Sequence, residues 1–437
     1  MRRFALVALS CLFVPSLSLL AADPLDGLDA AVNAGLKAHG VAGVSIAIVK
    51  NGRVIHVKGY GVRTVGQSDP VTEHTLFAIG SVTKSFTATA LGMLVDEKKL
   101  RWNDPLSTRV KNFRLDDPYI SQEATIRDAL SHRTGYARNE LVWYGSPFNR
   151  EQLVSKMARL KPDIPFRTGF RYNNLMYLMA GQTIPQATGK SWDDFVTERI
   201  FQPLRMESTL TSVTQLAPEL DVATPHEKVK GKPKPVDWKN IDNIGPAGSI
   251  LSSASDMAEY VKFHLSGGKA HGKRLLELTT QEELFTPQNL MPKPAFSFNE
   301  GAVSHAYGFG WMLSDFKGKP LAEHGGNIDG MTAQVGMLPS EKIGVVILAN
   351  GGQSLLPMAL MYDLLDRMTG EPNPDRAATT GFLDVLNSVG MEKLAEPNEA
   401  TRIKDTKPSL ALKKYAGKYQ DDKHAELAIT FKDDKLT

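Results

Sequence analysis

The stretch that decides the fold reads Leu76-Phe77-Ala78-Ile79-Gly80-Ser81-Val82-Thr83-Lys84, and a helix-forming run, Phe86 to Val95, follows it. Residues 76–79 are apolar and predict a strand, so we expect Ser81 in the first turn of a helix, where backbone N–H groups have no intrahelical partner. Lys84 is three positions further on and shares a helix face with Ser81. Burial lowers the pKa of a lysine, which would allow Lys84 to take the proton of the Ser81 hydroxyl. The pattern is typical of the nucleophile and base of an acyl-transfer enzyme.

The same spacing of serine and lysine occurs twice more, in Ser266 to Lys269 and in Ser314 to Lys317. The first pair lies in a glycine-rich loop, and the second runs into a turn at Gly318-Lys319-Pro320. Neither pair opens an apolar helix that would bury its lysine, so the context favours Ser81. The alternative for Ser81 is an ordinary serine at a helix N-cap.

The composition narrows the classes of function. The chain has 437 residues, of which 42% are hydrophobic and 23% charged, and its formal net charge is +3. These fractions are typical of a globular protein, and at about 150 residues per domain the length indicates two or three units. No run of Lys and Arg indicates a nucleic-acid partner. The ten histidines show no zinc spacing and no phosphate-binding loop is present, so we expect neither a metal nor a cofactor.

We expect residues 1–22 to be a secretory signal peptide. Two arginines precede an apolar run, Phe4 to Leu20, and Ala21-Ala22 offers small residues for cleavage. A membrane anchor is the alternative, although the run is short for a span. The single cysteine, Cys11, lies inside this segment, where a lipoprotein site is a further alternative. The predicted location is periplasmic or secreted, with no membrane span after cleavage.

The rest of the pattern predicts an α/β (α+β) protein. An amphipathic helix is expected over residues 24–39, and Asn51-Gly52 is a strong hairpin signal between two strands, Val44 to Ile48 and Arg53 to Val57. Residues 100–265 are rich in helix signals, which are clearest over 191–201 and 255–265, the latter capped by Ser253 or Ser255. Later strands and a closing helix are predicted over Tyr307 to Leu313, Gln334 to Leu338, Ile343 to Leu348 and Leu355 to Met368. We therefore expect one antiparallel sheet flanked by helices on both faces, with a helical insert.

The domain boundaries follow from composition. The main domain is predicted over residues 23–372, and a Pro-rich and polar stretch over 373–407 is predicted to be a linker. Residues 408–437 contain an alternating strand pattern, Glu426 to Phe431. A lone hairpin is only marginally stable, so this tail is either a docked strand or the start of a small C-terminal β module.

A second motif, Tyr172-Asn173-Asn174, precedes the apolar run Leu175 to Gly181. A phenol beside a lysine ammonium is easier to ionise, so we expect Tyr172 to carry the proton from Ser81 to the leaving group. Asn174 is placed to donate to a substrate amide. The alternative for Tyr172 is a half-buried aromatic in a loop.

A third motif, His324-Gly325-Gly326, comes just before a predicted hairpin. Two glycines allow a ligand to approach the edge of a strand closely. The next N–H group, on Asn327, is expected to form an oxyanion hole with the N–H of Ser81. The alternative is a glycine-rich turn with a solvated histidine.

These three motifs, in this order, resemble those of the penicillin-recognising serine hydrolases. The pattern is most similar to class C β-lactamases, D-alanyl-D-alanine carboxypeptidases, D-aminopeptidases and related esterases. The resemblance covers about residues 25–370, and further segments look familiar: Leu100 to Leu106, Leu130 to Gly135, Pro246 to Ile250 and Gly344 to Asn350. It implies a β-lactamase/transpeptidase-like fold in which Ser81 is the acylated nucleophile and Lys84 its base. It also implies that Tyr172 carries the proton, that Asn174 holds the substrate amide, and that residues 324–326 line a strand edge of the site.

One departure bears on the substrate. Classical β-lactamases carry a lysine where this sequence has His324, and that lysine holds the substrate carboxylate. A neutral histidine is a weaker anchor. The sequence therefore predicts an exported serine acyl-hydrolase that acts on D-amino-acid peptides or amides, β-lactams or small esters. The alternatives are a dedicated class C-like β-lactamase and a non-catalytic sensor of cell-wall fragments or β-lactams. The oligomeric state stays open.

Overall fold

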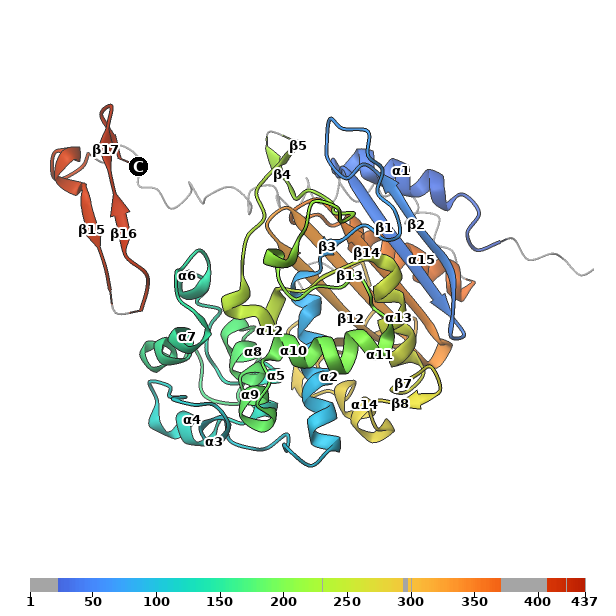
Figure 1. Ribbon diagram of the computed structural model, residues 1–437, viewed down its shortest axis with the longest axis horizontal. Helices are drawn as coiled ribbons and strands as arrows, with labels where there is room; N and C mark the ends of the chain where they lie inside the picture. The colour runs from blue at the N-terminus through green and yellow to red at the C-terminus, as the bar shows by residue number, and fades with distance from the viewer. Residues whose placement is uncertain are drawn as a thin grey trace, which may run out of the picture.

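The computed structural model describes residues 23–229, 231–293, 298–299, 301–370, 407–421 and 423–436. The predicted signal peptide over residues 1–22, with Cys11, lies outside the described residues. The predicted linker over 373–407 also lies outside them, apart from its last residue. The element labels below are those of Figure 1.

An eight-stranded antiparallel sheet forms the centre of the main domain, in the order β2-β1-β14-β13-β12-β11-β10-β9. Its strands are β1 (Gly43–Lys50), β2 (Arg53–Gly61), β9 (Asn289–Leu290), β10 (His305–Tyr307), β11 (Met312–Phe316), β12 (Lys319–Ile328), β13 (Met331–Leu338) and β14 (Ile343–Ala349). The predicted turn between β1 and β2 is confirmed, because Asn51 and Gly52 both have a left-handed backbone. β1 pairs with β2 on one side and with β14, the last strand of this sheet along the chain, on the other, so the predicted sharing of one sheet by early and late strands is confirmed.

Helices cover both faces of this sheet. On one face, α1 (Leu28–His39) and α15 (Leu356–Thr369) bury a core that includes Val44, Ile46 and Ile48 of β1. The other face carries α13 (Ala254–Leu265), which Ser253 caps by accepting the Asp256 N–H, and α2 (Thr83–Asp96). Side chains alternate between the two faces of a strand, which explains how β1 contributes to both cores. The expected sheet with helices on both faces is confirmed.

The helical insert packs against α2 on the side away from the sheet, and α2 runs between the two in Figure 1. Its helices are α3 (Leu106–Arg109), α4 (Pro118–Glu123), α5 (Ile126–Leu130), α6 (Glu140–Trp143), α7 (Arg150–Lys156), α8 (Asn174–Gly181), α9 (Thr183–Thr188), α10 (Trp192–Val196), α11 (Gln202–Leu204) and α12 (Gly245–Gly248). Short strands and one further helix complete the domain: β3 (Phe77–Ala78) paired with β6 (Leu251–Ser252), β4 (His226–Val229) with β5 (Lys232–Pro235), β7 (Lys269–Ala270) with β8 (Lys273–Arg274), and α14 (Leu278–Leu284). Every residue of α2 from Thr83 to Leu94 is buried, so this helix is enclosed between the sheet and the helical insert.

The predicted single strand over Tyr307 to Leu313 is wrong. The structure splits this run into the end of β10 and the start of β11, joined by a tight turn at residues 308–311. The Gly308 N–H donates to the Trp311 carbonyl at 2.9 Å, and Gly310 has a φ of 78°. Glycine adopts this left-handed conformation without the steric cost that other residues meet.

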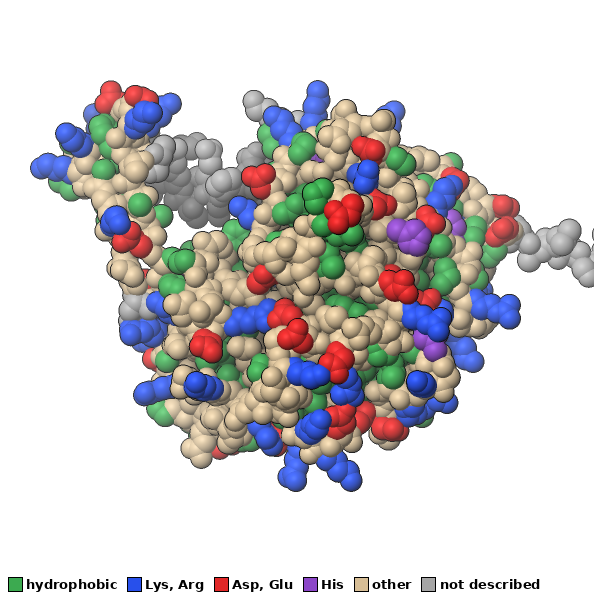
Figure 2. Space-filling view, in the orientation of Figure 1, with side chains coloured by type: hydrophobic (Ala, Val, Ile, Leu, Met, Phe, Trp, Pro, Cys, Tyr) green, Lys and Arg blue, Asp and Glu red, His purple; other side chains and the backbone are tan. Residues whose placement is uncertain are grey.

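Residues 407–436 form small hairpins of their own, apart from residue 422, which is not described. A helical turn over Leu412–Tyr415 precedes β15 (Gly417–Tyr419), which pairs with β16 (Leu427–Ile429), and β17 (Phe431–Lys432) pairs with β18 (Lys435–Leu436). The predicted strand from Glu426 to Phe431 is thus divided between β16 and β17. Lysine, arginine and acidic side chains interleave over the face of the molecule shown in Figure 2. Among the described residues, no helix has the length and apolar character needed to cross a membrane.

Candidate active site

The Ser81 hydroxyl lies in a 3-10 turn, η1 (Gly80–Val82), that leads directly into α2. The predicted helix start is thus confirmed within two residues. β3 and the Ile79 N–H, which donates to the Ile250 carbonyl at 3.0 Å, hold the entry to this turn. Gly80 has a φ of 50°, and a Cβ atom there would lie 2.8 Å from the Asn327 nitrogen. Glycine at this position therefore allows the turn to pack directly against β12.

The side-chain nitrogen of Lys84 is surrounded by three oxygen atoms. Nζ lies 3.0 Å from Ser81 Oγ, 2.7 Å from Asn174 Oδ1 and 2.8 Å from the Ala247 carbonyl oxygen. Lys84 is fully buried, and burial lowers its pKa well below the usual range. Nearby Arg138 lowers this pKa further, whereas Glu140 raises it.

This geometry suits a neutral amine. A neutral Lys84 has two N–H bonds, and two of its three neighbours, the Asn174 amide oxygen and the Ala247 carbonyl, can only accept. If these two oxygens take the two N–H bonds, the nitrogen lone pair faces Ser81 Oγ. The hydroxyl of Ser81 can then donate to Lys84, which is the starting arrangement for removal of its proton.

The Tyr172 side chain completes the group around Ser81. Its hydroxyl interacts with the Ser81 side chain, and its ring centroid lies 4.8 Å from Lys84 Nζ. Burial is the largest influence on this phenol and raises its pKa above the usual value. The expectation that a neighbouring lysine would ease ionisation of Tyr172 is therefore wrong, since desolvation outweighs the hydrogen bond with Ser81 and the charge of Arg138, which lower the pKa. Tyr172 is a neutral phenol at the site.

The Asn173 side chain fixes the place of both its neighbours. Its Oδ1 accepts the Met176 N–H at 3.1 Å and so caps α8, which directs Tyr172 and Asn174 to Lys84. Asn174 is 5% exposed, and its Nδ2 lies 3.4 Å from a Glu140 carboxylate oxygen. One side of Asn174 thus contacts the lysine and the other faces the cleft.

The edge of β12 lies against the nucleophile turn. A Cβ atom at Gly326 would lie 1.9 Å from the Ile79 carbonyl oxygen and 3.1 Å from the Ser81 nitrogen. The strand that carries the His324-Gly325-Gly326 motif therefore packs directly against the turn that carries Ser81. Only glycine at position 326 leaves room for this contact. Asn327 lines the same cleft as Ser81. Its N–H as part of an oxyanion hole stays a prediction.

The His324 side chain points inward, which the sequence did not indicate. It is 1% exposed, its Nδ1–H donates to the Gly325 carbonyl at 2.6 Å, and its Nε2 accepts from the Tyr307 hydroxyl at 2.9 Å. Burial lowers its pKa to about 3, so the ring is neutral. The alternative of a solvated histidine is wrong. The centroids of the His324 and Tyr172 rings lie 6.4 Å apart. A direct contact of His324 with substrate stays a prediction.

The two competing serine–lysine pairs are not arranged in this way. Ser266 Oγ donates to the carbonyl groups of Phe263 and Lys269, and Lys269 is exposed. Lys317 Nζ pairs with Asp366 at 2.7 Å instead of with Ser314. Of the three pairs, only Ser81 and Lys84 bring the lysine nitrogen to the serine hydroxyl among the contacts described for these residues.

Comparison with known proteins agrees with this geometry, since residues 28–366 match the beta-lactamase family. The chain belongs to the beta-lactamase family. It is a serine hydrolase of the penicillin-recognising type, as the order of its three motifs predicted. An unguisins hydrolase of Aspergillus campestris is 28% identical over 434 residues, which cover 94% of this chain and 79% of that protein. Penicillin-binding protein 4 of Amycolatopsis lactamdurans is 29% identical over 339 residues, which cover 76% of this chain and 86% of that protein.

A solved structure is similar as well. The octameric penicillin-binding protein homologue from Pyrococcus abyssi matches with a TM-score of 0.69 at 26% identity, over 80% of this chain and 78% of that one. This likeness confirms the predicted fold class for this member of the beta-lactamase family.

Several residues near the site of this beta-lactamase-family hydrolase carried no signal of their own in the sequence. The cleft beside Ser81 has a volume of about 310 Å³, and its charged lining consists of Arg138, Glu140, Glu227 and Asp329. Arg138 pairs with Glu140 at 2.5 Å, whereas Glu227 accepts a backbone N–H from Gly330 at 2.7 Å. The Ala247 carbonyl and His132 belong to segments noted only for their family resemblance. Within the described parts of the chain, no three potential ligands come together to hold a metal ion.

Proposed function

We propose that this protein hydrolyses amide or ester bonds through an acyl-enzyme formed on Ser81. The main support for this proposal is the environment of Lys84. Two neighbouring oxygens accept its two N–H bonds, which leaves the nitrogen lone pair for the Ser81 hydroxyl. In the proposed reaction Ser81 Oγ attacks the substrate carbonyl carbon as its proton passes to Lys84. The carbonyl oxygen becomes an oxyanion, and the N–H groups of Ser81 and Asn327 are the proposed donors that stabilise it.

The second half of the reaction uses the neutral phenol of Tyr172. Tyr172 passes a proton to the leaving group and recovers it through Lys84, so the acyl group stays on Ser81 while the leaving group departs. A water molecule then attacks the acyl carbon and gives its proton to the same relay, which frees the acid product and Ser81. Asn174 is proposed to contact the amide of the bound substrate from the floor of the cleft.

The charge of the cleft bears on the choice of substrate. His324 is neutral and buried where classical β-lactamases hold a carboxylate with a lysine, and the cleft lining contains three carboxylates and one guanidinium. An anionic substrate group would meet like charges, which costs binding energy. We therefore favour uncharged esters and amides, or peptides that contain D-amino acids, over a dedicated class C-like activity on β-lactams. The names of an unguisins hydrolase and a penicillin-binding protein among the relatives support hydrolysis and recognition of penicillin respectively.

We also propose that the protein is exported and works in the periplasm or outside the cell. The support is the charged, apolar and small-residue pattern of residues 1–22. Fractionation of cells that express the full chain, followed by mass measurement of the mature N-terminus, tests this. A mature chain that begins near residue 23 is expected, and a chain retained in the cytoplasm would contradict it.

A burst assay with p-nitrophenyl acetate and nitrocefin tests the proposed function. We expect a burst equal to the enzyme concentration with the ester and slower turnover of nitrocefin. Mass spectrometry after treatment with a fluorophosphonate should place the adduct on Ser81, and Ser81→Ala should lose both burst and adduct. Ser266→Ala is the matched control and should keep both.

Each other outcome has a clear meaning. Nitrocefin turnover much faster than ester turnover would indicate the class C-like alternative. An adduct with no turnover of either substrate would indicate the sensor. An adduct on Ser266 or Ser314 would overturn the assignment of the nucleophile.

A further inference from the structure

His132 is a buried histidine that the proposed reaction does not use. It follows α5, its side chain is 0% exposed, and its backbone has a φ of 55°, in the left-handed region. A residue other than glycine is uncommon in this conformation and persists only where the surroundings hold it. The residues around His132 therefore hold it in this conformation.

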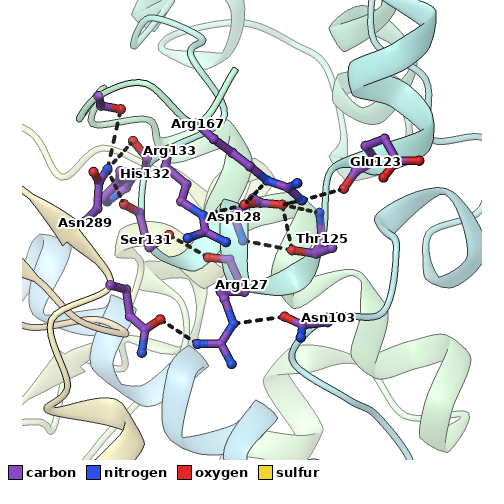
Figure 3. A network of polar contacts seen from close by, with 12 residues as sticks. Asn103, Glu123, Thr125, Arg127, Asp128, Ser131, His132, Arg133, Arg167 and Asn289 are labelled. Atoms are coloured by element: carbon purple, nitrogen blue, oxygen red, sulfur yellow. Dashed lines mark hydrogen bonds and ion pairs between the residues drawn. The ribbon is translucent and has the colours of Figure 1, made fainter. Parts of the chain in front are cut away.

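A buried carboxylate holds the segment that carries His132. Asp128 is 0% exposed and accepts hydrogen bonds from Arg133 Nε at 2.5 Å and Arg167 Nη2 at 2.8 Å. It also accepts the N–H and hydroxyl of Thr125, at 2.9 Å and 2.7 Å. Figure 3 shows the side chains of both arginines directed at this carboxylate. Because Arg133 follows His132 directly and Arg167 belongs to the segment before Tyr172, Asp128 ties the two segments together.

The backbone joins the same two segments directly. The Arg167 N–H donates to the Arg133 carbonyl at 2.9 Å, and the Arg171 N–H donates to the His132 carbonyl at 2.8 Å. The Asn173 N–H donates to His132 Nδ1 at 3.1 Å. These donors come from residues before and after Tyr172, so the position of His132 and that of Tyr172 are set jointly.

The Asn173 contact also fixes the protonation of the ring. A backbone N–H can only donate, so Nδ1 of His132 carries no proton, and the neutral ring has its proton on Nε2. Nε2 is buried and has no hydrogen-bond partner among the described residues. A protonated ring would place a donor against the Asn173 N–H. Burial lowers the pKa of His132 well below its usual value.

The ring of His132 lies against Tyr172. Their centroids are 4.3 Å apart with planes tilted by 33°, and the rings of Tyr307 and Tyr177 lie 4.7 Å and 5.1 Å from the imidazole. Aromatic rings at such distances attract one another and exclude other arrangements. We propose that His132 is the positioning residue of Tyr172: its imidazole, anchored by the Asn173 N–H, sets where the phenol stands relative to Ser81 and Lys84. This inference rests on the proposed function, because it concerns the proton carrier of that reaction.

The test is a double-mutant cycle between His132→Asn and Tyr172→Phe. Asparagine tolerates the left-handed backbone and can still accept the Asn173 N–H, but it removes the ring that supports the phenol. We expect His132→Asn to lower kcat for p-nitrophenyl acetate at least tenfold with KM within about twofold, since small misplacement of a reacting group costs rate. In the Tyr172→Phe background the same change should lower kcat by less than about threefold, because the phenol it positions is gone.

His264→Asn is the matched control. His264 is a buried histidine of α13 whose Nδ1 contacts Gln281 at 3.0 Å, and its ring packs on other residues than Tyr172. It should lower the thermal unfolding temperature about as much as His132→Asn and show no coupling to Tyr172→Phe. Equal losses of kcat from His132→Asn in both backgrounds would overturn the positioning role.

A second variant covers the case in which His132→Asn does not fold. Asn289 Nδ2 donates to the Ser131 carbonyl at 3.0 Å and the His132 carbonyl at 3.3 Å, from outside the loop. Asn289→Ala should therefore lower kcat with KM unchanged and be coupled to Tyr172→Phe, whereas additive losses would overturn the inference. If wild type forms the Ser81 adduct and these cycles are additive, only the positioning role fails. If wild type forms no adduct, the proposed function itself fails.

Discussion

Substitution of Gly326 by alanine should separate the strand edge from the nucleophile without removing any polar group. A Cβ atom at this position would stand 1.9 Å from the Ile79 carbonyl oxygen, whereas Cβ atoms in proteins essentially never approach another heavy atom within 3.0 Å. The two backbones must therefore move apart by roughly 1 Å, because neither contacting atom belongs to a side chain that can rotate away. The displaced segment begins two residues before Ser81.

A displacement of this size has two measurable costs. Misplacing a reacting group by about 1 Å can lower the rate about 100-fold, so we expect a loss of that order in kcat/KM for p-nitrophenyl acetate. Overpacking of a close contact costs about 1–3 kcal/mol of stability, which should appear as a lower midpoint of urea unfolding. The fluorophosphonate adduct on Ser81 should form more slowly by a similar factor.

Gly325→Ala is the matched control on the same strand. Its Cβ atom would point to the other face of the sheet and meet Gln334 Oε1 at 2.8 Å, the end of a side chain that can rotate. We expect a decrease in kcat/KM of less than about fivefold, since the nucleophile turn is not displaced. If Gly326→Ala kept wild-type kcat/KM, or if Gly325→Ala lost as much, the close packing of β12 against Ser81 would not govern the reaction.

Three further predictions concern protons. Lys84→Ala and Tyr172→Phe should each lower kcat by orders of magnitude. The double variant should lose less than the product of the two single losses, because the effects of groups that act in one relay are not additive. A double loss in steady-state kcat equal to that product would argue against a shared relay. Neutral Lys84 is the active form, so Arg138→Gln, which should raise the pKa of Lys84, should move the acidic limb of the pH profile of kcat/KM to higher pH. Glu140→Gln should lower that pKa and move the limb to lower pH. Shifts of both variants in the same direction would contradict the assignment of this limb to Lys84. Burial raises the pKa of Glu323 to about 7. The folded state therefore binds more protons than the unfolded state between about pH 5 and 7. The free energy of unfolding should fall as the pH rises through this range. Glu323→Gln should remove that decrease, and urea unfolding of both proteins at pH 5 and pH 8 measures it.

The sequence predicted the residues whose relation is local. Ser81 and Lys84 share one helical turn, so their spacing alone placed Nζ beside Oγ. Tyr172 and Gly326 are far from Ser81 in the chain, and their predicted place came from the order of motifs in a known family. The contacts of Tyr172 with Lys84 and of Gly326 with the nucleophile turn agree with that order.

Other features depend on tertiary contacts that leave no local pattern. The Ala247 carbonyl is a backbone atom, so nothing in its residue type indicates that it accepts from Lys84. The pKa of Tyr172 was predicted in the wrong direction because burial is a property of the whole fold. The run Tyr307 to Leu313 has the composition of one strand, and only the left-handed Gly310 divides it.

The pairing of β1 with β14 has a consequence for synthesis on the ribosome. The Gly43 N–H donates to Asn350 Oδ1 at 2.6 Å, across 307 positions of the chain. At roughly 5–20 residues per second, β14 leaves the ribosome about 15–60 s after β1. During that interval the hairpin of β1 and β2 is made but has no partner on its inner edge, and an isolated hairpin is only marginally stable. The nascent chain therefore offers an unpaired apolar strand to chaperones until translation has passed residue 349, and the nucleophile turn gains its wall from β12 only shortly before.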